Sequence, residues 1–209
     1  MPDGINLPVI LVAALLASGS PGPATLAIAG TSMKSGRRLG LALASGITTG
    51  SLMWSVAAAC GVGAMMLAHA WVLETLRYFG AGYLLFLGLK SAKAACSSSE
   101  PRPQGLAVAS AKRAYLRGLA LHLTNPKAIL FFVSVYSLAV PATAPAAAIA
   151  MVVVAVWIQS FVIFHGYALL FSVPPVVRGY LRARRWFEAA FALAFGAAGV
   201  KILIAKLQS

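Results

Sequence analysis

Six long apolar segments constrain this chain more than any other feature of its sequence. The segments are residues 6–32, 40–67, 72–92, 114–139, 145–172 and 187–207. Each can cross the roughly 30 Å of hydrocarbon in a bilayer, which takes about 20 residues of helix. Only 10% of the residues are charged, against about 25% in ordinary soluble domains. We therefore expect an all-α, polytopic membrane protein with six transmembrane helices.

The basic residues predict how the helices are oriented. Thirteen of the 17 Lys and Arg residues lie in or beside the first, third and fifth loops. They are Lys34, Arg37, Arg38, Lys90, Lys93, Arg102, Lys112, Arg113, Arg117, Arg178, Arg182, Arg184 and Arg185. Loops rich in Lys and Arg face the cytoplasm, so both termini should lie outside. The net charge of +13 then favours anionic lipid headgroups as partners, and not nucleic acid.

The chain divides into two halves of three segments each. Residues 1–93 and 113–209 flank a small, polar and proline-containing stretch, residues 94–112, which we interpret as a cytoplasmic linker. Five residue pairs match between the halves at an offset of 108: Arg77 and Arg185, Tyr78 and Trp186, Phe79 and Phe187, Tyr83 and Phe191, Gly88 and Gly196. An odd number of spans per repeat inverts the second copy in the membrane. We therefore predict two inverted three-helix repeats.

Two proline breaks interrupt corresponding segments of the two halves. Ser20-Pro21-Gly22-Pro23 breaks the first segment, and Asn125-Pro126-Lys127 breaks the fourth. Proline removes a backbone donor from a helix, and in hydrocarbon the freed groups must be buried in protein or line a cavity. Freed amides attract a carboxylate and freed carbonyls attract an ammonium group. The breaks, near the middle of the bilayer, are candidate substrate-binding sites, and structural kinks are the alternative.

Polar residues near the breaks are candidates for binding and for proton transfer. Lys127 is the one charge well inside a predicted span, which favours a counter-charge for a substrate carboxylate or part of a gate. The alternative for Lys127 is a bond to freed carbonyls. Four polar residues flank the breaks and either bind substrate or cap the half-helices: Ser20, Thr25, Thr124 and Asn125. A proton or polar relay could use His122, Gln159 and His165, unless each is simply a hydrogen-bonded packing residue.

Several kinds of chemistry have no support in the sequence. The four acids, Asp3, Glu74, Glu100 and Glu188, are terminal or near loops, so we expect no buried carboxylate for proton or metal work. Cys60 and Cys96 form no C-x-x-C pair. No nucleophile-elbow or phosphate-loop pattern is present. We expect no enzymatic activity, no metal site and no cofactor.

Glycines recur at a four-residue spacing around the second segment. Gly36 and Gly40 form one G-x-x-x-G pair, and Gly46 and Gly50 form another. Small residues at this spacing let two helices approach closely. We interpret all four as packing residues.

The combination of these motifs resembles the LysE/RhtB family of amino-acid exporters. The resemblance covers about residues 5–205 and rests on Pro21-Gly22-Pro23, Ser35-Gly36-Arg37-Arg38-x-Gly40, Gly46-x-x-x-Gly50, Tyr83 to Gly88, Gly118-x6-Asn125-Pro126-Lys127-Ala128 and Phe131-Phe132. It implies a six-span carrier of the bacterial inner membrane that exports amino acids or their derivatives by proton antiport. The chain departs from the family pattern at Ala24 and Ser51, where many members carry polar or acidic residues.

The leading hypothesis is therefore an amino-acid exporter that works by alternating access. Its partners would be a small-molecule amino-acid substrate and membrane lipids, with a homodimer as an open alternative to a monomer. Efflux of a metal or toxic cation is a second hypothesis, against which the absence of His-rich or acidic clusters argues. A non-transporting membrane scaffold is the third.

Overall fold

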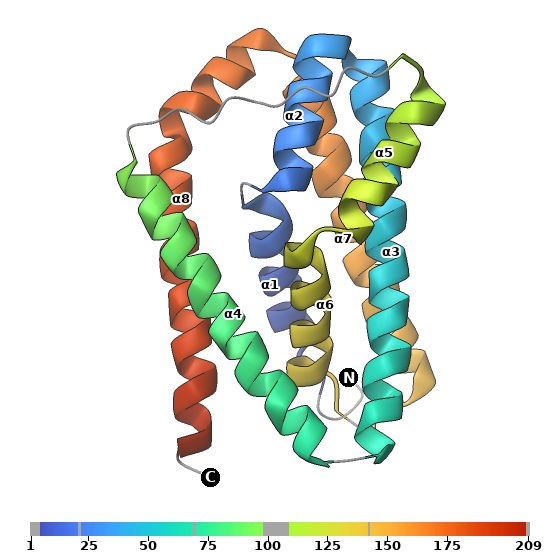
Figure 1. The fold of residues 1–209 in the computed structure, drawn as a ribbon, viewed down its shortest axis with the longest axis vertical. Coiled ribbons are helices and arrows are strands. Elements are labelled where there is room, and N and C mark those ends of the chain that lie inside the picture. Colours follow the sequence, from blue (N-terminus) through green and yellow to red (C-terminus); the bar gives the residue numbers. More distant parts are fainter. Residues whose placement is uncertain (1–4, 21, 69, 98–108, 142, 208–209) are drawn as a thin grey trace.

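The protein folds into an upright bundle of α-helices (Figure 1). The computed structural model describes residues 5–20, 22–68, 70–97, 109–141 and 143–207, and this part of the chain contains helices and no strand. The helices are α1 (Leu7–Gly19), α2 (Pro23–Ser35), α3 (Arg37–Ala68), α4 (Ala70–Cys96), α5 (Ala111–Leu123), α6 (Pro126–Ala139), α7 (Ala146–Leu170) and α8 (Pro174–Leu207). The expected all-α class is confirmed. Residues 98–108 of the predicted linker lie outside the described residues.

Two of the six predicted spans meet the length and hydropathy expected of membrane-crossing helices, and two more do so if each bent pair of helices is one span. Residues Arg37–Gly61 of α3 and the whole of α7 qualify alone. The pair α1 and α2, and the pair of α5 with Lys127–Tyr136 of α6, qualify only together, as a broken span or a re-entrant loop bent by 52° and 57°. The spans predicted over α4 and α8 remain predictions.

The last helix is longer than the predicted sixth span. We expected the segment to begin at about residue 187, but α8 begins at Pro174 and includes the basic stretch that we had interpreted as a loop. Proline is favoured in the first turn of a helix because its missing N–H has no partner there in any case. Arg178, Arg182 and Arg185 follow at spacings of four and three, which place them on one side of α8.

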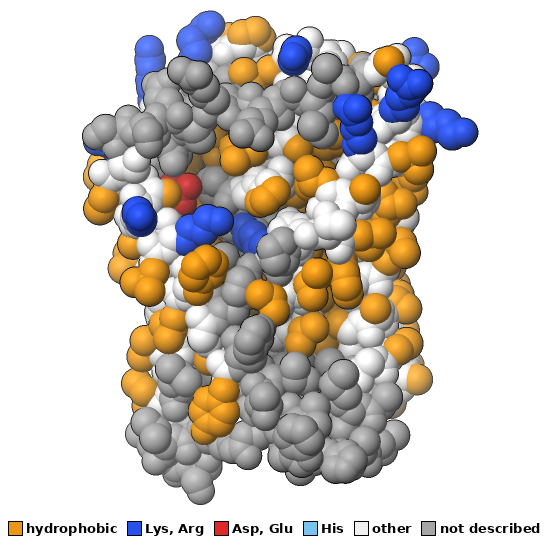
Figure 2. All heavy atoms as spheres, viewed as in Figure 1, with side chains coloured by type: hydrophobic (Ala, Val, Ile, Leu, Met, Phe, Trp, Pro, Cys, Tyr) orange, Lys and Arg blue, Asp and Glu red, His pale blue; other side chains and the backbone are white. Residues whose placement is uncertain are grey.

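Many of the basic residues described by the structure lie at one end of the molecule. The α2–α3 corner and the first turns of α5 and α8 meet at the upper end in Figure 1, whereas α1 begins and α8 ends at the lower end. Figure 2 shows blue Lys and Arg side chains at this upper end and a second group near mid-height, with orange hydrophobic side chains over the flanks. The first and fifth basic loops of the prediction thus lie toward one end, while residues 98–108 of the third lie outside the described residues.

Close helix packing depends on glycines. A Cβ on Gly46 would lie 2.0 Å from the Tyr115 carbonyl oxygen, and one on Gly118 would lie 2.2 Å from the Leu43 carbonyl oxygen, so α3 and α5 touch through their backbones. Gly88 of α4 faces Gly196 of α8, where an added Cβ would come within 3.0 Å of backbone nitrogen. These two glycines are a matched pair of the predicted repeats. The packing interpretation holds for Gly40, Gly46 and Gly50, while Gly36 ends α2 with φ 85° and has open space around it.

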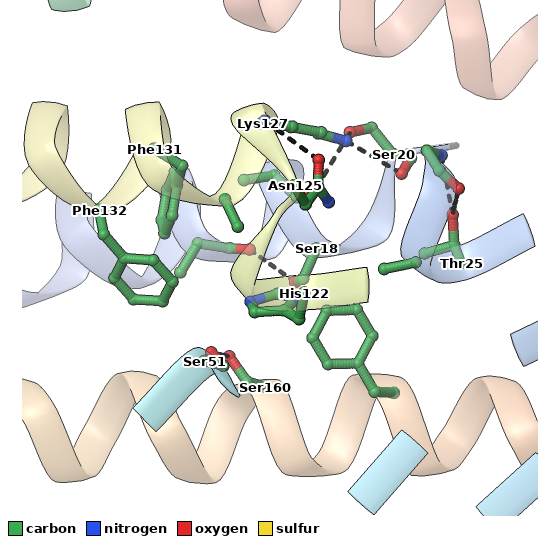
Figure 3. Close-up of a pocket in the computed structure, with 16 residues that line it drawn as sticks. Ser18, Ser20, Thr25, Ser51, His122, Asn125, Lys127, Phe131, Phe132 and Ser160 are labelled. Atoms are coloured by element: carbon green, nitrogen blue, oxygen red, sulfur yellow. Dashed lines mark hydrogen bonds between the residues drawn. The ribbon is translucent and has the colours of Figure 1, made fainter. Parts of the chain in front are cut away.

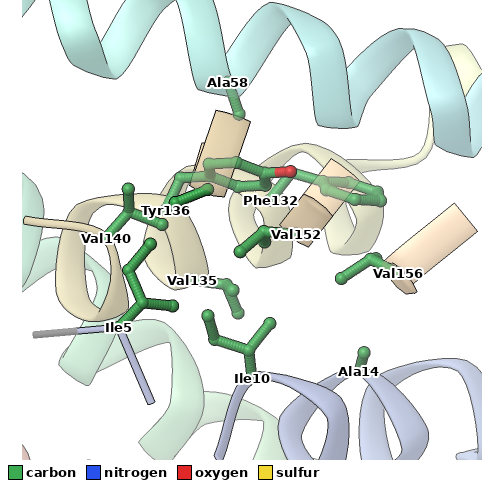
Figure 4. Close-up of a cluster of buried hydrophobic side chains, with 11 residues drawn as sticks. Ile5, Ile10, Ala14, Ala58, Phe132, Val135, Tyr136, Val140, Val152 and Val156 are labelled. Carbon is green, nitrogen blue, oxygen red and sulfur yellow. The ribbon is translucent and has the colours of Figure 1, made fainter. Parts of the chain in front are cut away.

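Two separate hydrophobic clusters lie on either side of the helix breaks. The first joins α1, α3, α6 and α7 through Ile5, Ile10, Ala14, Ala58, Phe132, Val135, Tyr136, Val140, Ala148, Val152 and Val156 (Figure 4). The second joins α2, α3, α5 and α7 through Ala24, Ala27, Ile28, Leu43, Ala44, Ile47, Ala114, Phe164 and Ala168. Each broken span therefore contributes one half-helix to each cluster.

Candidate functional site

Local hydrogen bonds replace those lost at the first break. Prolines at positions 21 and 23 cannot donate to the carbonyls of Ala17 and Gly19, four residues earlier. The Ser20 hydroxyl donates to the Ala17 carbonyl oxygen at 3.2 Å. The Tyr167 hydroxyl of α7 donates to the Gly19 carbonyl oxygen at 2.7 Å. Both freed carbonyls thus gain a partner inside the protein, as a break within hydrocarbon requires.

Lys127 connects the two breaks. Its Nζ donates to the Ser20 carbonyl oxygen at 3.2 Å and also to the Ser20 hydroxyl. The backbone N–H of Lys127 donates to Asn125 Oδ1 at 3.1 Å, which makes Asn125 the N-cap of α6. A Cβ on Gly22 would lie 3.4 Å from Lys127 Nζ, so Gly22 is directly beside the ammonium group. The cation of the second break therefore completes the hydrogen bonding of the first.

Thr25 caps the start of α2. Its hydroxyl accepts from the Gly22 N–H at 2.8 Å and donates to the Gly22 carbonyl oxygen at 3.1 Å. Pro23 is the first residue of α2 and is exposed, and Pro126 is the first residue of α6. Pro21 lies outside the described residues. The start of α2 leaves first-turn amides that the helix itself cannot pair, a favourable setting for an anion. At the start of α6, the amides of Lys127 and Ala128 already bond Asn125.

A small cavity lies where the breaks meet, between the two hydrophobic clusters. Its volume is about 40 Å³, counted over positions open to the centre of a water molecule. The lining residues are Ala14, Ala17, Ser18, Ser20, Gly22, Ala24, Thr25, Ser51, His122, Asn125, Lys127, Ala128, Phe131, Phe132, Ser160 and Phe164. In Figure 3, Lys127, Asn125 and Ser20 lie on one side of His122, and Ser51 and Ser160 lie on the other.

Six of the predicted site residues line this cavity, and three others bond elsewhere. The six residues that line the cavity are Ser20, Gly22, Thr25, His122, Asn125 and Lys127. Thr124 is exposed and its hydroxyl donates back to the Ala120 carbonyl at 2.9 Å. Gln159 donates to the Leu11 carbonyl at 2.8 Å and ties α7 to α1. His165 bonds Ser45 and the Phe161 carbonyl, both at 3.0 Å, away from the cavity.

His122 differs from His165 in having no hydrogen-bond partner. It is 4% exposed, and neither ring nitrogen is bonded to any residue that the structure describes. Its ring meets Phe164 edge to face, with 5.9 Å between the ring centroids. Gln159 Oε1 also lacks a partner among the described residues, but of the three predicted relay residues His122 is the one that lines the cavity.

Three cavity serines were missing from the predicted binding and relay set. Ser51 Oγ donates to Ser160 Oγ at 3.0 Å and joins α3 to α7 at the cavity wall. Ser18 lines the cavity from α1. Ser51 carried a signal, since it is one of the two departures from the family pattern. Ser160 follows Gln159 directly, and neighbouring residues of a helix point about 100° apart. Ser160 therefore faces the cavity, and Gln159, the residue selected from the sequence, does not.

The expectation that no carboxylate is buried is wrong for Glu188. This residue is 4% exposed in α8, which packs extensively along α4. Glu188 and Lys90 of α4 both interact electrostatically with Lys127. The sequence placed Glu188 beside a loop because α8 was expected to begin at about residue 187. Among the described residues, no group of three or more His, Cys, Asp or Glu could hold a metal ion.

Apolar helices with two bent helix pairs around a cavity are the arrangement found in many α-helical membrane transporters. More narrowly, the chain belongs to the LysE type translocator family, whose sequence profile matches residues 15–206. The resemblance noted in the sequence is thereby confirmed.

Curated relatives cover most of the chain. It is 31% identical over 196 residues to the threonine efflux protein of Escherichia coli K12, which covers 92% of this chain and 94% of the relative. It is 28% identical over 194 residues to the threonine efflux protein of Salmonella typhimurium, with the same coverage. It is 32% identical over 169 residues to the leucine efflux protein of Salmonella typhimurium, covering 78% and 79%. No solved structure gives a significant match.

Proposed function

We propose that this protein exports a neutral amino acid across the bacterial inner membrane by alternating access, in exchange for protons. The observation that carries the proposal is the bond from Lys127 Nζ to the Ser20 carbonyl, which brings both broken helices to one cavity. Membership of a translocator family supports transport. Relatives that are named threonine and leucine efflux proteins support an amino-acid substrate.

The cavity offers a site for a carboxylate. Lys127 supplies a cation, the start of α2 supplies amides, and the starts of α2 and α6 supply the positive ends of two helix dipoles. Of the described residues that line the cavity, none is acidic. That lining favours a zwitterionic substrate with an uncharged side chain over a cationic one. Efflux of a metal cation, the alternative, finds no ligand cluster among the described residues.

The six-span arrangement and the inverted repeats belong to the same proposal. Helix α5 packs on α3, and α1 packs on α7, so the first half of each broken span contacts the unbroken helix of the other repeat. Helices α4 and α8 pack on each other through the matched glycines Gly88 and Gly196. This reciprocal pattern supports two inverted repeats that rock about the cavity. The basic end would face the cytoplasm, with both termini outside.

An export assay tests the proposed function. Cells that lack their own exporters are loaded with peptides rich in one amino acid, and excretion is followed with and without the protein. We expect faster excretion of a small neutral amino acid, and slower excretion when a protonophore removes the proton gradient. No change across a broad panel of amino acids would overturn the substrate class. Metal tolerance assays on the same cells test the cation alternative.

A non-transporting scaffold makes the opposite prediction for the site residues. Asn125→Ala and Lys127→Ala would leave a scaffold function intact, because neither change affects the outer surface of the bundle. For a carrier both variants should lower export while the protein still reaches the membrane. Membrane fractionation beside the export assay separates the two outcomes.

A further inference from the structure

We propose that His122, with the Ser51–Ser160 hydroxyl pair, binds the ammonium group of the exported amino acid, and that the same imidazole carries the exchanged proton. This inference rests on the proposed function and assigns a second subsite to its cavity. It starts from the two unpartnered ring nitrogens of a side chain that is 4% exposed. Buried polar groups are nearly always hydrogen-bonded, so an unpartnered imidazole at a cavity wall indicates a partner that arrives as a ligand.

The ring is held in position by its packing. An added Cβ on Gly50 would lie 3.0 Å from the His122 Cβ, so α3 approaches this part of α5 closely. Phe164 of α7 meets the ring edge to face at a centroid distance of 5.9 Å. A side chain confined from two helices presents its nitrogens in a defined direction, as a binding group must.

The charges of a zwitterion fix which end of the cavity each group takes. Lys127 attracts the carboxylate and repels the ammonium group, which must find its acceptors elsewhere. His122, Ser51 and Ser160 lie on the other side in Figure 3 and can accept hydrogen bonds. Among the described lining residues from α1, α2, α3, α6 and α7, only Lys127 is charged or titratable beside His122. The imidazole is thus the strongest acceptor available to the amino group.

Competition between the ammonium group and a proton for one ring nitrogen of His122 couples amino-acid export to proton import. A neutral imidazole accepts a hydrogen bond from the ammonium group, whereas a protonated one has no acceptor and repels it. Substrate and proton therefore bind the cavity alternately. If the carrier converts between its inward-facing and outward-facing conformations only with an amino acid or a proton bound, it exchanges the two. In each conformation it must release one of these ligands before it can bind the other.

Purified full-length protein in liposomes tests this inference, with counterflow of a labelled neutral amino acid and the lumenal pH as readouts. His122→Gln keeps a hydrogen-bond acceptor but cannot hold a proton. We expect its apparent affinity to fall severalfold, because the amide oxygen is a weaker acceptor than the imidazole, while the counterflow that remains moves protons only at background level. His122→Phe also loses the acceptor, so its apparent affinity should fall by about tenfold or more. His165→Gln, the matched control, should retain coupling, because His165 lies outside the cavity.

Each outcome decides a separate point. Proton movement at the wild-type level in His122→Gln would overturn the inference and leave the proposed function standing. Loss of coupling in Glu188→Gln with retention in His122→Gln would also overturn it, in favour of the buried carboxylate. If wild type itself exchanges no amino acid, the proposed function fails. The pH dependence of wild-type counterflow gives a check without mutation: apparent affinity should fall about tenfold per pH unit below the pH at which His122 titrates.

Discussion

Replacing Lys127 by methionine tests the carboxylate subsite most directly. Methionine keeps an unbranched side chain of similar length but removes the cation that donates to the Ser20 carbonyl at 3.2 Å. A hydrogen bond to a charged group contributes about 1.5–3 kcal/mol. Loss of the bond that Lys127 would make to the substrate carboxylate should raise the Km for the amino acid by about 10- to 150-fold. Part of the effect on stability is offset because the Ser20 carbonyl lines a cavity that can hold water.

The assay compares an amino acid with its amide in counterflow experiments on liposomes. The amide lacks the negative charge, so wild type should bind it more weakly than the acid, and Lys127→Met should bind the two about equally. Lys127→Arg retains the cation and should keep much of the preference for the acid. Lys93→Met removes an exposed lysine from the end of α4 and serves as the control. A Lys127→Met protein that still prefers the acid by the wild-type ratio would refute the assignment.

Three further substitutions test the packing around the site, each followed by the melting temperature of the purified protein. Gly118→Ala places a Cβ 2.2 Å from a carbonyl of α3 and should destabilise the protein by about 1–3 kcal/mol, whereas Gly166→Ala meets nothing within 4 Å and should be neutral or stabilising. Asn125→Ala removes the N-cap of α6 at a cost of about 1 kcal/mol, and aspartate at this position should restore stability. Tyr136→Phe breaks the 2.6 Å bond to the Ser55 hydroxyl at a cost of about 1–3 kcal/mol, and adding Ser55→Ala should recover part of it. Equal melting temperatures for the Gly118 and Gly166 variants, or no recovery in the double variant, would contradict these contacts.

The helix breaks could be predicted from sequence because their cause is local. Prolines at 21, 23 and 126 lack the donor that a helix needs, and α2 and α6 begin at Pro23 and Pro126. The replacement partners could not be predicted in the same way. The Gly19 carbonyl is satisfied by Tyr167, which is 148 residues away in sequence. Such a partner depends on how α7 rotates against α1, and the local pattern does not fix that rotation.

Helix rotation and packing also explain where the structure departs from the expected positions. Gln159 and Ser160 are neighbours on α7, and Ser160, which was not selected, lines the cavity while Gln159 bonds the Leu11 carbonyl. Glu188 is buried because α8 packs along α4. No pattern within residues 187–207 indicates that contact. His122 and Lys127 were identified because a titratable group inside an apolar segment is costly wherever it points.

In the proposed transport, the bond between Lys127 and Ser20 would act as a switch that depends on substrate. A ligand shifts a conformational equilibrium only through contacts that differ between the two states. Lys127 Nζ donates to the carbonyl and the hydroxyl of Ser20, in the break between α1 and α2. A bound carboxylate would compete for those donors and would release the Ser20 carbonyl. Because α1 packs in one hydrophobic cluster and α2 in the other, a change at this break would alter how the two clusters are joined. The residue that binds the carboxylate would thus also loosen the connection about which the carrier must rock.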